Sequence, residues 1–126
     1  MRDLLSLITI APGRYVFDLA FDGVIKVSAV AHPSHLEVPD DIVRYAKTNV
    51  PLLIESCEVD QMFPRELQAE TDAILGDGKF SPGYKQDYWP GCRHGFAVRG
   101  DQSDPAVKAG KEGAFKNVVE WMAKYL

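Results

Sequence analysis

Short apolar segments with the composition of β-strands alternate along this chain with segments of helical pattern. The predicted strands are residues 4–10, 24–30, 51–55 and 84–89, and the predicted helices are residues 15–21, 39–47, 64–75 and 105–126. Such alternation is typical of an α/β fold in which helices cover a mainly parallel sheet, here of about four strands. The 126 residues are enough for one domain with a hydrophobic core and too few for two, so residues 1–126 are predicted to be a single domain.

Signals at the helix ends support these predictions. Asp40 and Asp41 stand in the first turn of the second helix, where negative charge suits the helix dipole. Pro64 begins the third helix and Gly76 follows it, which is the usual placement of these two residue types. The apolar residues expected on one face of the last helix are Val107, Ala114, Phe115, Val118, Val119, Met122 and Tyr125.

The charge and the apolar runs exclude several classes of protein. The net charge of −4 and the pI of about 5.3 argue against a nucleic-acid binder, which usually carries a basic surplus. No apolar run approaches the ~20 residues that span a bilayer. The apolar stretch 4–11 is predicted to be a strand rather than a signal peptide, because Asp3 precedes it and Pro12 and Gly13 follow it. No nucleic-acid or membrane partner is therefore expected.

The cysteines and two of the histidines carry weak signals. Cys57 and Cys92 show neither zinc spacing nor a Cys-x-x-Cys pair, which favours two free packing thiols in a reducing, cytoplasmic setting, with a disulfide between them left open. His32 and His35 flank a Pro-Ser dipeptide, but no carboxylate or cysteine cluster completes a metal site around them. A role in loop packing is expected for these histidines, and no metal or cofactor is predicted.

Two polar side chains follow the last two predicted strands. Asp60 lies in the loop after residues 51–55, and His94 lies between Gly91 and Gly95 just after residues 84–89. A carboxylate and an imidazole at neighbouring strand ends are two of the three members of a nucleophilic triad, with the histidine as general base and the aspartate orienting it. Asp60 also stands shortly before the third predicted helix, so capping of that helix is an alternative role for it.

The third member of a triad is a Ser or Cys in a Gly-x-Ser/Cys-x-Gly turn, and no such turn precedes Asp60 and His94. Ser28 and Ser34 lack flanking glycines, so neither is predicted to be an activated nucleophile. Arg99 follows the histidine loop and is a candidate for binding a substrate carboxylate, since a guanidinium matches a carboxylate in shape and charge. A solvated or ion-paired arginine is the alternative.

These residues fall in blocks that resemble the C-terminal half of the dienelactone hydrolase family, in particular its fungal members. The blocks are VAHPS at 30–34, PLLI at 51–54, DQMFP at 60–64 and YWPGCRHGFAVRGD at 88–101. The resemblance runs from about Gly13 to the C-terminus. It implies an α/β-hydrolase fold, an activity that opens esters and lactones with a Cys-Asp-His triad, and the roles of acid for Asp60 and base for His94.

The chain departs from the family at the nucleophile. A turn of the type Gly-Tyr-Cys-Phe-Gly-Gly precedes the corresponding helix in the family, whereas here the nucleophile position falls on or next to Ile10, and only Gly13 remains of the turn. The family's earlier strands and its oxyanion-hole loop have no counterpart in the chain. This predicts a partial α/β-hydrolase fold, as expected of a truncated gene model, a splice form or a paralogue without its front half.

Two functions follow from this comparison. The first is carboxylic-ester or lactone hydrolysis on a small molecule, inherited from the family but inactive in the chain as written, because Ile has no nucleophilic atom. The second is a non-catalytic module that self-associates through the sheet edge where the early strands would lie, since a bare apolar edge invites pairing.

Overall fold

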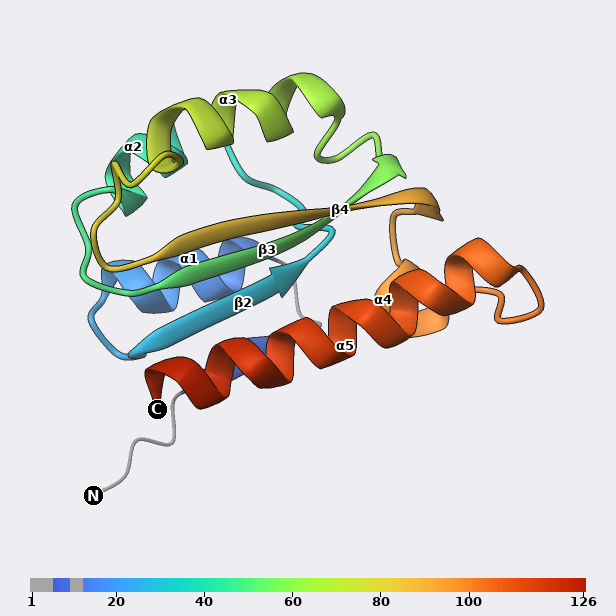
Figure 1. Ribbon diagram of the computed structural model, residues 1–126. Helices are drawn as coiled ribbons and strands as arrows, with labels where there is room; N and C mark the ends of the chain where they lie inside the picture. Colours follow the sequence, from blue (N-terminus) through green and yellow to red (C-terminus); the bar gives the residue numbers. More distant parts are fainter. Residues whose placement is uncertain (1–5, 10–12) are drawn as a thin grey trace.

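The computed structural model describes the backbone of residues 6–9 and all of residues 13–126. Its elements are β1 (Ser6–Thr9), α1 (Gly13–Phe21), β2 (Val27–Ala31), α2 (Asp40–Tyr45), β3 (Leu52–Val59), α3 (Arg65–Leu75), β4 (Tyr84–Arg93), α4 (Phe96–Arg99) and α5 (Pro105–Tyr125) (Figure 1). Residues 4, 5 and 10 of the first predicted strand lie outside the described residues, and so does the predicted nucleophile position at residue 10.

The sheet has four strands in the order β1-β2-β3-β4, and every neighbouring pair is parallel. Ala29 of β2 pairs with Leu53 of β3, which in turn pairs with Lys85 of β4. The predicted α/β fold with a parallel sheet of four strands is confirmed. Since all strands run the same way, their carboxyl ends share one end of the sheet, at the right in Figure 1.

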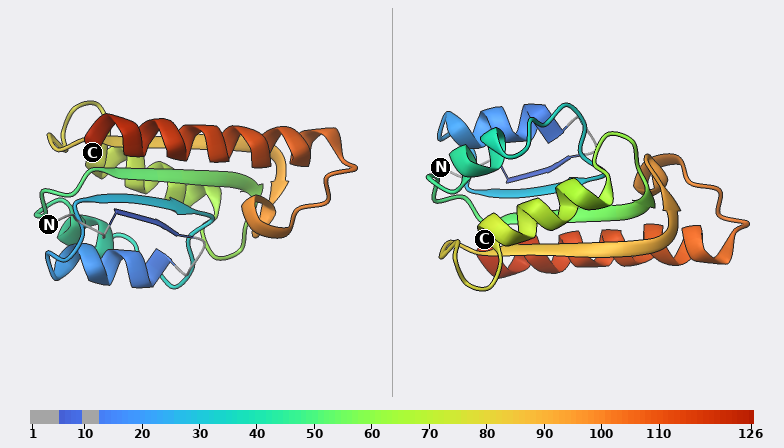
Figure 2. Two further views of the ribbon diagram at one scale, coloured as in Figure 1. Left: turned by 90° about the horizontal axis from the view of Figure 1, so that it is seen from below. Right: turned by 90° about the horizontal axis from the view of Figure 1, so that it is seen from above.

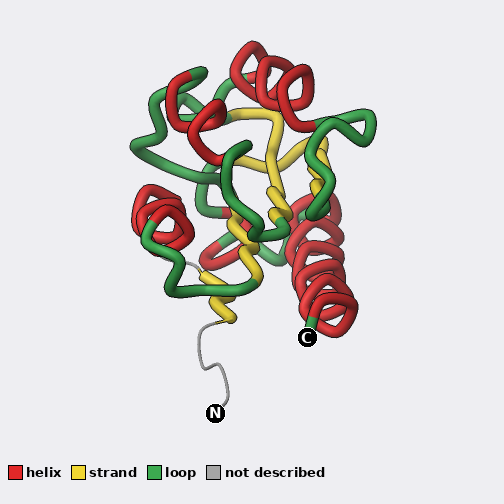
Figure 3. Tube along the Cα trace, turned by 90° about the vertical axis from the view of Figure 1, so that its left-hand side faces the viewer, coloured by secondary structure: helices red, strands yellow, loops and turns green. Residues whose placement is uncertain are grey.

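Helices cover both faces of this sheet, as alternating side chains along the strands require. Val30, Leu52 and Ile54 face α1, α2 and α3 in the larger core cluster. Val27, Ala29 and Leu53 point to the other face and pack against α5. Figures 2 and 3 show α1 and α5 on opposite sides of the strands.

The third and fourth strands are longer than the sequence pattern predicts. Residues 56–59 were expected in a loop, but β3 continues to Val59 because it pairs with β4 through Cys57 and Trp89 and through Val59 and Arg93. A register shift between these pairs takes up the irregular segment around Pro90. Proline is tolerated there because β4 is the last strand in the sheet order, so it needs no ladder partner on its outer side.

Two other predictions are corrected by packing. Residues 90–104, between the predicted strand 84–89 and the predicted helix 105–126, contain the rest of β4 and the single turn α4, which the buried Phe96 anchors. In α5 the expected apolar face is wrong at Phe115 and Val119, which are 70% and 46% exposed. The residues of α5 that are buried are Val107, Gly110, Ala114, Val118, Trp121 and Met122.

Gly110 explains how α5 comes so close to the end of β4. A Cβ atom at this position would lie 2.5 Å from Sγ of Cys92 and 3.3 Å from the Phe96 ring. Only a glycine permits this approach without displacing both side chains. The contact brings the loop after β4, which contains His94, against a rigid helix.

Candidate active site

Asp60 and His94 meet at the carboxyl end of the sheet. Asp60 follows β3 and His94 follows β4, and because these strands are parallel neighbours, the two loops lie side by side. Nδ1 of His94 lies 2.9 Å from Oδ1 of Asp60. The backbone N–H of His94 also donates to the carbonyl of Val59 at 2.9 Å, so the histidine loop is tied directly to the end of β3.

The carboxylate of Asp60 is held rigidly. Its side chain is fully buried, and Oδ1 accepts the backbone N–H groups of Met62 at 2.9 Å and Phe63 at 3.1 Å. Asp60 therefore stabilises the turn before α3, but the alternative role of capping this helix is wrong, since α3 begins after Pro64 without a side-chain cap. One side chain serves both the turn and the histidine, because an ionised carboxylate can accept several hydrogen bonds.

The turn after His94 depends on Gly95, whose φ of +92° lies in the left-handed region that favours glycine. The chain then enters α4, and the ring of Phe96 inserts into the core beside Cys57, Cys92 and Ala114. This anchor fixes the loop on one side, and the bond to Asp60 fixes the imidazole on the other. His94 itself remains partly open to solvent, with 32% of its side chain exposed.

A third strand end contributes to the same cluster. Oγ of Ser34, in the loop after β2, lies 3.2 Å from Nε2 of His94. The ring of His32 stands edge-on to the His94 ring, with centroids 4.9 Å apart, and to the Phe96 ring at 5.5 Å. Burial, together with the neighbouring His94, lowers the pKa of His32 to about 4, so His32 is a neutral packing ring at pH 7.

Asp60 and His94, which the sequence places after neighbouring strands, lie together in the structure, and Ser34, which was not predicted to be an activated nucleophile, lies beside them. The signal for Ser34 is tertiary, because the serine is 60 residues from the histidine in sequence. The loop-packing role predicted for His32 agrees with its burial, whereas His35 is exposed and touches none of the cluster in the contacts described.

The two cysteines are free and buried, in agreement with the favoured reading of the sequence. Sγ of Cys57 lies 3.8 Å from Oδ2 of Asp60. Burial, together with the charge of Asp60, raises the pKa of Cys57 to about 12. Burial raises the pKa of Cys92 as well. Both thiols are therefore protonated and poor nucleophiles at neutral pH.

An open pocket of about 350 Å³ adjoins the histidine loop. His94 and Phe96 form part of its wall, and the charged residues around it are Arg93, Arg99, Asp101 and Asp104. Arg99 is exposed, and its Nε would lie 3.5 Å from a Cβ atom on Gly95. The guanidinium predicted to bind a carboxylate thus lies beside Gly95, and Arg99 lines the same pocket as His94.

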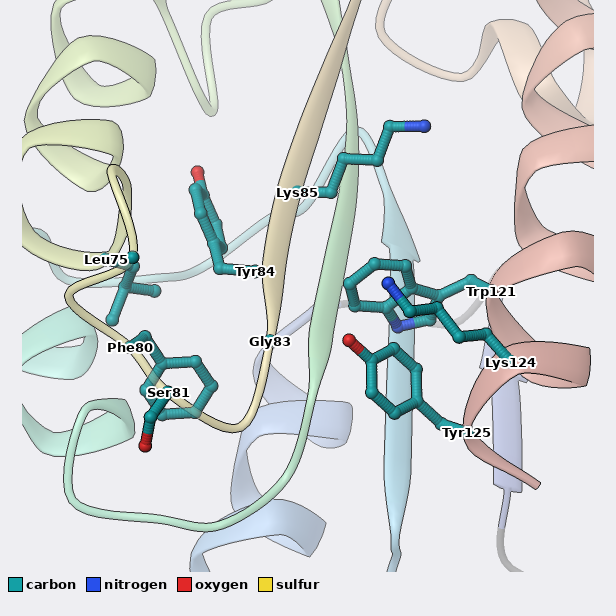
Figure 4. Close-up of a pocket in the computed structure, with 10 residues that line it drawn as sticks. Leu75, Phe80, Ser81, Gly83, Tyr84, Lys85, Trp121, Lys124 and Tyr125 are labelled. Carbon is teal, nitrogen blue, oxygen red and sulfur yellow. The ribbon is translucent and has the colours of Figure 1, made fainter.

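A second pocket, of about 400 Å³, lies at the other end of the sheet, where β4 begins (Figure 4). Phe80 and Gly83 border it on the side of the loop before β4, and Trp121 and Tyr125 border it from the end of α5. Lys124 lies over the rings of Trp121 and Tyr125, at 5.9 Å and 5.2 Å from their centroids. This pocket is remote from His94 and takes no part in the candidate site.

Two other kinds of site have no counterpart among the residues that the structure describes. Among residues 6–9 and 13–126, no group of three or more His, Cys, Asp or Glu side chains is arranged to hold a metal ion. In the same part of the chain, no helix combines the length and the apolar character needed to cross a membrane.

A parallel sheet with helices on both faces, and a buried aspartate bonded to a histidine at its carboxyl end, define the class of α/β folds to which the α/β-hydrolases belong. The model of the Dienelactone hydrolase family matches residues 12–126. The chain therefore belongs to the dienelactone hydrolase family, and the resemblance noted in its motifs is confirmed.

Two curated relatives are fungal proteins. The chain is 32% identical over 114 residues to hydrolase tropI of Talaromyces stipitatus, and the match covers 90% of this chain and 42% of that protein. It is also 32% identical over 114 residues to hydrolase pyvD of Aspergillus violaceofuscus, where the match covers 90% of this chain and 44% of that protein. The matched region thus spans less than half the length of either relative.

Proposed function

We propose that this chain carries the acid–base half of a site for hydrolysis of a carboxylic ester or lactone, with His94 as general base and Asp60 as the acid that orients it. The observation that supports this most strongly is the 2.9 Å contact between His94 Nδ1 and the buried Asp60 Oδ1. Membership of the dienelactone hydrolase family supports the reaction class.

The chemistry follows from the arrangement of the two groups. Asp60 accepts the Nδ1–H of His94, which leaves Nε2 free to take a proton from a nucleophile. The negative charge of Asp60 then stabilises the imidazolium that forms. Because two backbone N–H groups already hold Asp60 in place, little reorganisation is needed when that charge develops.

Arg99 is proposed to select the substrate. Its guanidinium stands on the wall of the pocket beside His94, where it can pair with a carboxylate on the ester or lactone. Asp101 and Asp104 on the same wall oppose an anion placed farther out. The preferred substrate is thus a small ester or lactone with a single carboxylate close to the scissile bond.

The acid–base pair is testable without any turnover. We expect Asp60→Asn to weaken the hydrogen bond of the His94 Nδ1–H, because the substitution replaces a charged acceptor with a neutral amide oxygen. The proton resonance of the His94 ring N–H, recorded by NMR at one fixed pH, measures this directly. Asp104→Asn is the matched control, since it removes a carboxylate from the pocket wall that makes no described bond to His94. An unchanged ring N–H resonance in Asp60→Asn would contradict the proposal.

The source of the nucleophile decides whether the chain turns over substrate. Ile10 at the family's nucleophile position predicts an inactive chain, unless another side chain presents a nucleophilic atom to His94. Neither cysteine meets this need, because both are buried and protonated.

Association through β1 is a second candidate function, and the sheet order favours it. In the described part of the chain, β1 is at one edge of the sheet and pairs only with β2. A parallel strand of four residues at an edge presents unpaired backbone N–H and C=O groups that can extend the sheet. A second copy of the chain is the proposed partner, because each copy offers the same edge and a symmetric pair satisfies both.

A further inference from the structure

The hydroxyl of Ser34 lies within hydrogen-bond distance of Nε2 of His94, the ring nitrogen that a nucleophile must contact. Oγ of Ser34 lies 3.2 Å from Nε2, while Nδ1 of the same ring contacts Asp60 at 2.9 Å. We propose that Ser34 is the nucleophile of this chain and that Ser34, His94 and Asp60 form a working triad. This inference rests on the proposed function of the His94–Asp60 pair and adds the atom that attacks the substrate.

A triad is recognised by the geometry and the roles of its members rather than by the local sequence around the serine. The required contacts are a nucleophile bonded to the base and a base bonded to an orienting acid, and both are present. The chain order Ser34, Asp60, His94 is the order in which α/β-hydrolases place nucleophile, acid and base. The distance of 3.2 Å is at the long end of the range, as is usual before substrate binds.

The backbone on either side of Ser34 is bent by two residues in left-handed conformations. His32 has a φ of +37° and His35 a φ of +61°, so left-handed residues without glycine stand on both sides of the Pro33-Ser34 pair. Such conformations are strained for these residue types and persist only where the surroundings enforce them. The contacts around this loop therefore hold a backbone conformation that glycine would otherwise favour.

Those contacts come from two elements, β3 and the start of α1. The N–H of His32 donates to the carbonyl of Glu55 at 2.8 Å, which ties the turn to β3. The N–H of Arg14, in the first turn of α1, donates to the carbonyl of Ser34 at 3.3 Å. Gly13 approaches Pro33 so closely that a Cβ atom on Gly13 would lie 2.6 Å from the proline Cβ. Ser34 is therefore clamped between β3 and the start of α1.

The charges around the cluster suit this assignment. His32 packs against the His94 ring but is neutral at pH 7, so it does not repel the imidazolium that forms there. Ser34 is partly exposed, whereas Cys57 and Cys92, the other candidate nucleophiles near the site, are buried. Among the described side chains, the Ser34 hydroxyl alone combines access to solvent with contact to Nε2 of His94.

The reaction balances with water as the only co-reactant. Oγ of Ser34 bonds to the acyl carbon of the ester, and its proton passes to Nε2 of His94. The tetrahedral adduct then breaks the bond to the alkoxide, which takes the proton from Nε2 and leaves as the alcohol, or stays tethered if the substrate is a lactone. Water, deprotonated by His94, attacks the acyl-serine, and the proton returns to Oγ as the carboxylic acid leaves.

The experiment combines labelling with turnover. A fluorophosphonate probe should add its phosphonyl mass to the peptide that contains Ser34, and the label should be lost in His94→Ala. Hydrolysis of p-nitrophenyl acetate should fall by about 10²-fold or more in Ser34→Ala, the scale of general-base catalysis. Ser81→Ala, an exposed serine at the opposite end of the sheet, is the control and should change neither readout.

The labelling experiment uses the unsubstituted chain, so it remains informative even if Ser34→Ala fails to fold. Ser34→Cys is a second probe, because a thiol at this place should be alkylated by iodoacetamide faster than in the same variant carrying His94→Ala. No label on Ser34 in the unsubstituted chain overturns the inference. Hydrolysis that depends on His94 but survives Ser34→Ala also overturns it, yet leaves the proposed function intact. Hydrolysis that is unchanged in His94→Ala would overturn both this inference and the proposed function.

Discussion

Glu55 offers the sharpest test of the energetics of this fold. The side chain is in the middle of β3, is 0% exposed, and bonds through Oε1 to the indole N–H of Trp89 at 2.6 Å. Its Oε2 has no hydrogen-bond partner in the described part of the chain. Burial raises the pKa of Glu55 from 4.5 to about 9, and the nearby charge of Asp87 adds to the rise while the Trp89 bond opposes it. Glu55 is therefore protonated in the folded chain at pH 7.

The sign of the pH dependence follows from this shift. An unfolded Glu55 loses its proton near pH 4.5, whereas the folded chain keeps it until about pH 9. Between these two values the folded state binds more protons, so the free energy of unfolding falls as the pH rises. One pKa unit corresponds to about 1.4 kcal/mol, so from pH 5 to pH 7 this group alone lowers the stability by about 2–3 kcal/mol.

Glu55→Gln should remove this dependence, because the amide has the same shape, cannot ionise and can still accept the bond from Trp89. We expect the variant to gain stability over the parent by about 2–3 kcal/mol between pH 5 and pH 7, measured by urea unfolding followed through tryptophan fluorescence. Glu120→Gln is the control, since that carboxylate is on the surface with 62% of its side chain exposed. A stability difference between Glu55→Gln and the parent that stays constant with pH would refute the reasoning.

If the chain associates through β1, its mass measured by light scattering should rise over a concentration series from that of one chain toward that of two. A constant monomer mass, with a melting temperature independent of concentration, would rule out this association. Arg99→Gln should raise KM for an ester with a carboxylate beside the scissile bond by about tenfold and leave KM for a neutral ester unchanged, as expected for a charged pair worth about 1.4 kcal/mol. Equal effects on both esters would show that Arg99 does not bind the carboxylate.

The sequence by itself determined the order of the elements and two residues of the candidate site. Strand-like runs separated by helical segments favour a parallel sheet, and the chain adopts such a sheet. Parallel strands deliver their following loops to one end of the sheet. The positions of Asp60 and His94 in the chain therefore already predicted that they meet there.

Only the tertiary structure decided the rest, because the remaining features depend on contacts between distant segments. β3 extends to Val59 through pairing with β4, which no local propensity of residues 56–59 encodes. The buried face of α5 is set by its close approach at Gly110, so Phe115 faces solvent in spite of its apolar ring. Ser34 reaches His94 because α1 and β3 clamp its turn, and a search for glycines flanking the serine cannot detect such a clamp.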